Sequence, residues 1–155
     1  MSAVSRQEPD VSHRPLRKLL SLAERVAVVT GGSHGIGRAN CLRLAEAGAT
    51  VAVDDLDQPA AALVAWTIVE AGGAAAAFAV DARRPMELER LAAAAVSEFG
   101  AISIWISNAG LHPIRPALEI TEAEWNLVLD TNLRGAFFGA QAAVRRMPEH
   151  GGVPA

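Results

Sequence analysis

Tyrosine is missing from the 155 residues of this sequence, and lysine occurs only once, at Lys18. Chemistry that needs a phenol hydroxyl beside a lysine ammonium is therefore not expected from these residues by themselves. A single cysteine, Cys41, excludes an internal disulfide and fits a reducing compartment, so we expect a cytoplasmic protein.

Long apolar runs and a strong net charge are also absent. No apolar stretch reaches the roughly 18 residues that a membrane helix needs, and the N-terminus lacks the compact apolar segment of a secretory signal. A net charge of −3 gives no electrostatic preference for nucleic acid. We therefore expect neither a membrane nor a nucleic-acid partner. The composition, 51% hydrophobic and 20% charged, is that of a globular domain.

Residues 1–20 form a polar arm, and after it short apolar segments alternate with helical segments. We expect this arm to be flexible and residues 21–155 to form one domain. The expected strands are 25–29, 50–53, 74–80 and 102–106, and the expected helices are 36–47, 57–71, 85–99 and 122–147. Residues 74–80 are rich in Ala and are assigned to a strand only because the alternation requires one. The pattern predicts an α/β fold with an incomplete, doubly wound parallel sheet of about four to five strands and helices on both faces.

A glycine-rich loop joins the first expected strand to its helix, with the sequence Thr-Gly-Gly-Ser-His-Gly-Ile-Gly over residues 30–37. Gly31 allows a tight turn, Gly35 lets the backbone approach a pyrophosphate, and Gly37 permits close packing of helix on strand. The start of the helix directs N–H groups at the phosphates. The alternative is an ordinary glycine-rich turn, which the strand–loop–helix context disfavours.

Acidic residues follow the second expected strand. A carboxylate at this point can accept the ribose hydroxyls of an adenosine and repels a 2′-phosphate. Asp55 is the expected ligand by register, Asp54 is its neighbour, and Asp57 is better interpreted as a helix cap. No arginine follows directly, so the pattern favours NAD, with NADP less favoured.

Three ordered motifs resemble the short-chain dehydrogenase/reductase family, which has a Rossmann-type fold. They are the glycine loop, Ser107–Gly110 and Asp130–Gly135. The resemblance implies cofactor binding by Gly31, Ser33, His34, Gly35, Ile36, Gly37, Asp55, Leu56, Asp81, Ala82, Asn108, Ala109 and Gly110.

The resemblance also implies individual roles. Asp81, with Ala82, would bind the adenine amine, and the segment from Asn108 to Gly110 would stabilise the sheet and contact the ribose side. Asn132 would kink its helix and hold a water of the proton relay, which makes it the catalytic candidate. The alternative for Asn132 is a polar residue on a half-exposed helix.

The sequence departs from the family pattern at several positions. Ser107 stands where Asn is more common, Trp105 is bulky for a central strand, and His34 lies where NADP-preferring members often carry Arg. A neutral imidazole would not strongly attract a 2′-phosphate, so NAD remains the expected cofactor.

In the family, a strand carrying Ser and a Tyr-x-x-x-Lys helix follow the last of these motifs, and neither is found here. The resemblance therefore implies that residues 21–155 are a truncated NAD(P)-binding Rossmann-like domain. It would bind dinucleotide, but would act on a small alcohol or carbonyl substrate only if the C-terminal half were supplied. The histidines and Cys41 lack metal-ligand spacing, so no metal site is expected. Three hypotheses follow, namely a dehydrogenase fragment, a catalytically inactive dinucleotide-binding or partner-interaction module, and a non-functional remnant.

The fourth expected strand, residues 102–106, would lie at an edge of the sheet in the strand order of the family. It carries no charge and no proline. An edge of this kind pairs readily with another chain. We therefore expect a homo-oligomer or an aggregation-prone protein.

Overall fold

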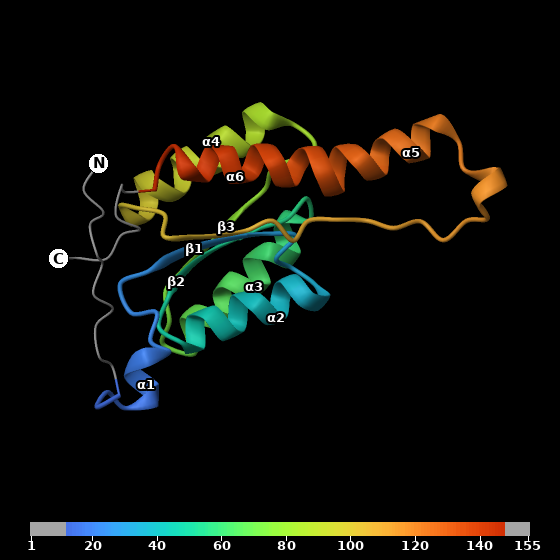
Figure 1. Ribbon diagram of the computed structural model, residues 1–155. Helices are drawn as coiled ribbons and strands as arrows, with labels where there is room; N and C mark the ends of the chain where they lie inside the picture. Colours follow the sequence, from blue (N-terminus) through green and yellow to red (C-terminus); the bar gives the residue numbers. More distant parts are fainter. Residues whose placement is uncertain (1–11, 148–155) are drawn as a thin grey trace, which may run out of the picture.

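The computed structural model describes residues 12–147 and shows a parallel sheet between two layers of helices (Figure 1). Expectations for residues 1–11 and 148–155 lie outside the described part. The strands are β1 (Val26–Thr30), β2 (Thr50–Asp54), β3 (Ala75–Phe78) and β4 (Ile104–Ile106). The helices are α1 (Leu16–Leu19), α2 (Gly35–Glu46), α3 (Gln58–Glu70), α4 (Pro85–Phe99), the 3₁₀ turn η1 (Ala117–Glu119), α5 (Glu122–Leu129), the π-helical turn η2 (Asp130–Gly135) and α6 (Ala136–Val144).

The sheet has the order β3-β2-β1-β4, and all of its pairs are parallel. This order confirms the Rossmann-type fold class and places β4 at an edge among the described strands. Side chains of β1 and β2 alternate between two cores. Val29, Val51 and Val53 pack under α2 and α3. Val28 and Ala52 face α4 and α6 on the other side of the sheet.

The Ala-rich segment does form a strand, although it is shorter than expected. β3 pairs with β2 from Ala75, opposite Val51, to Phe78, opposite Asp54. β4 is also shorter than the predicted 102–106, but Ile102 is fully buried in the core beneath α4 and α6. Both segments therefore hold their expected places in the sheet even where their ends differ.

The long helix expected over residues 122–147 is divided into three parts. A capping box begins α5, because Thr121 Oγ1 accepts from the Glu124 N–H at 3.2 Å and Glu124 Oε2 accepts from the Thr121 N–H at 3.0 Å. After α5 the chain widens into the π-helical turn η2 and then continues as α6 to Val144. A π-helical turn inside an α-helix often marks a functional region.

Trp105 fits into β4 because the facing helix carries a glycine. A β-carbon at Gly139 of α6 would lie 2.9 Å from Trp105 Nε1, so a larger residue would push the indole aside. Trp105 Nε1 donates to Ser107 Oγ at 3.0 Å. The bulky residue is thus accommodated by a matching small one.

The segment expected to be a mobile arm contains one short helix. α1 covers Leu16–Leu19 and buries none of its side chains. The flexibility of the arm stays a prediction. Within residues 12–147, no helix is both long enough and apolar enough to cross a membrane.

Candidate functional site

A cavity of about 640 Å³ opens where the chain leaves the C-terminal ends of the four strands. This is the end of a doubly wound sheet at which ligands bind, and the volume is within the range of ligand pockets. Every predicted cofactor residue except Ser33 lines it. Seven residues that were not predicted to bind the cofactor also line it, namely Asp54, Val80, Arg83, Leu111, His112, Leu127 and Thr131.

The glycine loop forms one wall of the cavity and leads into α2. Gly31 and Gly35 have φ values of 64° and 49°, a region that side-chain-bearing residues rarely adopt. A β-carbon at Gly35 would meet no atom within 4 Å, so open space adjoins the backbone there. The N-cap of α2 is His34, and no side chain caps this end. The first N–H groups of α2 have no intrahelical partner and suit a phosphate.

Thr30 and Asn108 join this loop to the loop after β4. The buried Thr30 Oγ1 accepts from the backbone N–H groups of Asn108 and Ala109, each at 3.1 Å. Asn108 Nδ2 donates to the carbonyl oxygens of Thr30 at 3.1 Å and Gly31 at 2.9 Å. Two walls of the cavity are therefore held in one arrangement. Thr30 is thus a site residue that the sequence motifs alone did not identify.

Asp55 is tied to the glycine loop and retains accepting capacity. Its Oδ2 accepts from the N–H of Ser33 at 3.2 Å and from the Ser33 hydroxyl, and its Oδ1 accepts from the N–H of Asp57 at 3.1 Å. Ser33 Oγ also lies 2.7 Å from His34 Nδ1. One of the lone pairs on Oδ1 thus remains for a ligand. Ser33 is buried and holds Asp55 in place from behind the cavity wall.

Two other acids near the end of β2, Asp54 and Asp57, have different environments. Asp54 is buried, and its Oδ1 accepts from the Val80 N–H at 3.0 Å. Burial raises the pKa of Asp54 to about 7, and the nearby charges of Asp55 and Glu87 add to the rise. Asp57 caps α3 by accepting from the Ala60 N–H at 3.1 Å, which confirms its expected role. Asp55 is thus the most accessible acid with a free acceptor in the cavity wall.

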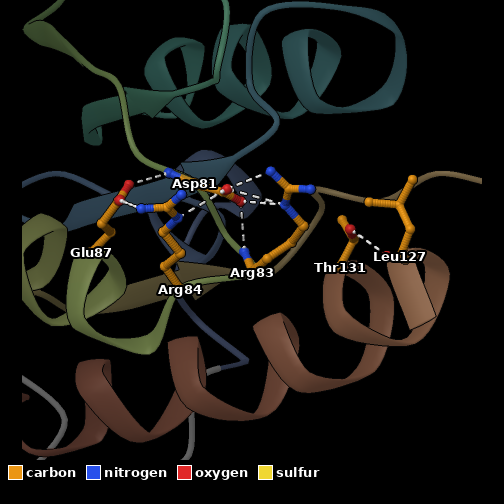
Figure 2. Close-up of polar contacts among 6 residues, drawn as sticks. All are labelled: Asp81, Arg83, Arg84, Glu87, Leu127 and Thr131. Carbon is orange, nitrogen blue, oxygen red and sulfur yellow. Dashed lines mark hydrogen bonds and ion pairs between the residues drawn. The ribbon is translucent and has the colours of Figure 1, made fainter. Parts of the chain in front are cut away.

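Asp81 lines the cavity from the loop between β3 and α4, where two arginines hold its carboxylate (Figure 2). Its backbone N–H donates to Glu87 Oε2 at 2.7 Å. A hydrogen bond from Arg83 is the largest cause that lowers the pKa of Asp81 below its usual range. The carboxylate is therefore an ionised acceptor, but Arg83 occupies it. The two arginines that follow Asp81 two and three residues later, Arg83 and Arg84, were the sequence signal for this pairing.

Asn132 lies outside the cavity lining. Its amide bonds twice with the backbone of Leu111, as Nδ2 donates to the carbonyl oxygen at 2.8 Å and Oδ1 accepts from the N–H at 2.9 Å. It therefore anchors the loop after β4 to η2. The catalytic role of Asn132 stays a prediction. Within residues 12–147, no group of three or more His, Cys, Asp or Glu side chains could hold a metal ion.

Comparisons with known proteins agree with this geometry. A family model described as short chain dehydrogenase matches residues 25–153. L-rhamnose 1-dehydrogenase (NAD(P)(+)) of Azotobacter vinelandii is 38% identical over 134 residues, which are 84% of this chain and 52% of that protein. D-threitol dehydrogenase of Mycolicibacterium smegmatis is 37% identical over 128 residues, which are 83% of this chain and 49% of that protein. The chain thus spans about half the length of the curated relatives it matches.

A solved dehydrogenase/reductase from Sinorhizobium meliloti has a similar structure. It superimposes with a TM-score of 0.82 at 35% sequence identity, over 84% of this chain and 52% of that one. A short-chain type dehydrogenase/reductase from Mycobacterium marinum superimposes with a TM-score of 0.82 at 35% sequence identity. The match covers 86% of this chain and 54% of that one.

Proposed function

Because the chain belongs to the short-chain dehydrogenase family, we propose that its cavity binds a nicotinamide dinucleotide and prefers NAD to NADP. One observation carries this proposal, namely that the uncapped start of α2 and the Asp55 carboxylate line the same cavity. The first suits the pyrophosphate and the second the adenosine ribose. A 2′-phosphate beside Asp55 would place two negative charges together, which costs binding energy.

The family membership supports a role in oxidation and reduction of an alcohol or carbonyl substrate. A bound nicotinamide dinucleotide supplies hydride transfer. The described residues would bind and orient it, with the glycine loop at the phosphates, Asp55 at the ribose and Asp81 at the base. The 155 residues contain no Tyr to serve as the acid that the family uses. We therefore propose that this chain by itself binds the dinucleotide without accelerating hydride transfer.

Titration with NADH and with NADPH, followed by the fluorescence of the nicotinamide ring, tests this proposal. We expect NADH to bind about tenfold or more tightly than NADPH. Asp55→Asn should bring the two affinities closer by removing the negative charge. Asp57→Ser is the matched control, because it removes a neighbouring charge while serine still caps α3. A chain that binds neither dinucleotide, or an unchanged preference in Asp55→Asn, would contradict the proposal.

A second role, a binding module that associates with a second copy of the chain, is favoured by the exposed surface. β4 lies at the edge of the described sheet, and large apolar side chains are exposed along α5, η2 and α6. These side chains are Trp125, Leu129, Leu133, Phe137 and Val144. Light scattering coupled to size-exclusion chromatography would show a dimer or larger species, and a clean monomer would exclude this role.

The buried, unpaired Cys41 supports a reducing compartment such as the cytoplasm.

A further inference from the structure

Arg83 places a hydrogen-bond donor at the part of the cavity where the base of the dinucleotide is proposed to lie. Its Nε is 2.8 Å from Asp81 Oδ1 and 3.0 Å from Oδ2, and its Nη2 is 2.6 Å from Oδ2. Among residues 12–147, the hydrogen bonds of this guanidinium all go to Asp81. The Nη1 group makes no hydrogen bond within these residues and keeps its donors for a ligand.

Arg83 occupies the carboxylate that an adenine amine would need. Asp81 Oδ1 also accepts from the Arg83 N–H at 3.0 Å, so both oxygens are already engaged by this one residue. An adenine amine must therefore displace the Arg83 side chain or share the carboxylate with it. The donor that is moved aside stays next to the base.

Arg83 can move without leaving Asp81 unpaired, because a second guanidinium is present. Arg84 Nε lies 3.5 Å from Asp81 Oδ2, and Figure 2 shows the two guanidinium groups on opposite sides of the carboxylate. The Asp81 side chain is only 11% exposed, whereas that of Arg83 is 42% exposed. A buried carboxylate stripped of all cationic partners would be costly, and Arg84 prevents this. Arg83 also lines the cavity, and Arg84 does not.

Purine bases differ in the groups that they would present to this pair. Adenine offers an amino donor, which a carboxylate can accept. A 6-oxopurine such as hypoxanthine offers the O6 acceptor and an N1–H donor, and Arg is a good partner for O6. A carboxylate and O6 are both hydrogen-bond acceptors, so a carboxylate alone would leave O6 without a donor. The combination of Asp81 and Arg83 can satisfy either base.

We propose that the base-binding part of this cavity accepts 6-oxopurine dinucleotides as well as adenine dinucleotides, with Arg83 as the residue that determines this breadth. The inference rests on the proposed function, since it assumes that the cavity binds a nicotinamide dinucleotide with its base at Asp81. It goes further by assigning to Arg83 a role in choosing the base.

The test compares NADH with reduced nicotinamide hypoxanthine dinucleotide on the full 155-residue chain, by fluorescence titration of the shared nicotinamide ring. We expect the two dissociation constants to agree within about threefold in the wild-type chain. In Arg83→Gln the hypoxanthine compound should bind about tenfold or more weakly than NADH, because O6 loses its charged donor. Arg83→Lys keeps a charged donor and should restore part of the binding.

Arg84→Gln is the matched control, because it removes the same charge from the other side of Asp81. We expect it to leave the ratio of the two dissociation constants unchanged. The inference would be overturned by strong discrimination against hypoxanthine in the wild-type chain, or by equal changes of the ratio in both glutamine variants. A chain that fails to bind NADH at all would instead overturn the proposed function, so the two failures can be told apart.

Discussion

Gly37 in the first turn of α2 packs directly on the carbonyl oxygen of Gly31. A β-carbon at Gly37 would overlap that oxygen and lie 2.5 Å from Asn108 Nδ2. The turn after β1, the start of α2 and the loop after β4 thus meet at one point. Any side chain at Gly37 would force these three segments apart, and they form the proposed phosphate site.

Gly37→Ala should destabilise the chain and weaken NADH binding together. Overpacking in a tight region typically costs about 1–3 kcal/mol, and the contact here is with backbone, which cannot rotate away. Urea denaturation should show a lower midpoint, and fluorescence titration a weaker NADH complex. Gly35→Ala is the control, because its β-carbon would meet no atom within 4 Å. That variant should lose only about 1 kcal/mol from the positive φ. Equal stability of the two variants would contradict the packing argument.

Thr30→Val should loosen the connection between the two loops. Valine has nearly the same shape but no hydroxyl, so the N–H groups of Asn108 and Ala109 would lose their acceptor. An unsatisfied buried donor costs about 1–3 kcal/mol. We expect a lower urea midpoint for Thr30→Val and a smaller change for Thr30→Ser, which keeps the oxygen. If serine were no better than valine, the hydroxyl would not be what joins the loops.

The order of strands and helices could be predicted because most segments carry a local signal. β1 and β2 are short, apolar and β-branched, glycines mark the turns, and Thr121 and Glu124 form the capping box that their spacing indicates. Even the weak, Ala-rich β3 could be placed by alternation. The first and last residues of β3 and β4 depend on pairing with neighbouring strands, so these ends were predicted less well.

The irregular parts of the site depend on tertiary contacts that no local pattern encodes. Residues 122–147 read as one helix, and the π-helical turn in its middle coincides with contacts to other segments. Asn132 bonds with Leu111, and a β-carbon at Gly135 would lie 2.6 Å from the Ala82 carbonyl oxygen. The family resemblance implied an irregularity at Asn132 but not its π-helical form. The position of Arg83 in the cavity likewise depends on how the loop after β3 folds.

Cys41 should be unreactive in the folded chain. It lies on the buried face of α2, its Sγ–H donates weakly to the Gly32 carbonyl oxygen at 3.7 Å, and burial raises its pKa to about 12. Little thiolate, the reactive form, is then present at neutral pH. We expect an aromatic disulfide reagent, which releases a coloured thiolate when it reacts with a thiol, to react slowly with the native chain and fully in denaturant. Rapid reaction of the native chain would show that α2 opens readily.

Asp54 should make the stability of the chain depend on pH near neutrality. Its pKa is raised by burial to about 7 in the folded chain, compared with about 3.9 for an unperturbed aspartate. Between these values the folded chain holds a proton that the unfolded chain has lost. The contribution of this group to the free energy of unfolding is therefore fully present below about pH 4 and is lost as the pH rises through 7.

Asp54→Asn should remove this dependence, because its amide oxygen can still accept from Val80 and no charge has to be buried. Relative to the wild-type chain, the variant should gain on the order of a few kcal/mol in unfolding free energy between pH 5 and pH 8. Urea denaturation of both chains at several pH values measures this difference. Asp81, whose pKa is lowered by Arg83, has the opposite effect at acidic pH in both chains, so it cancels in the comparison. Parallel stability curves for the two chains would mean that Asp54 is ionised throughout this range, and that water or a cation reaches it from the cavity.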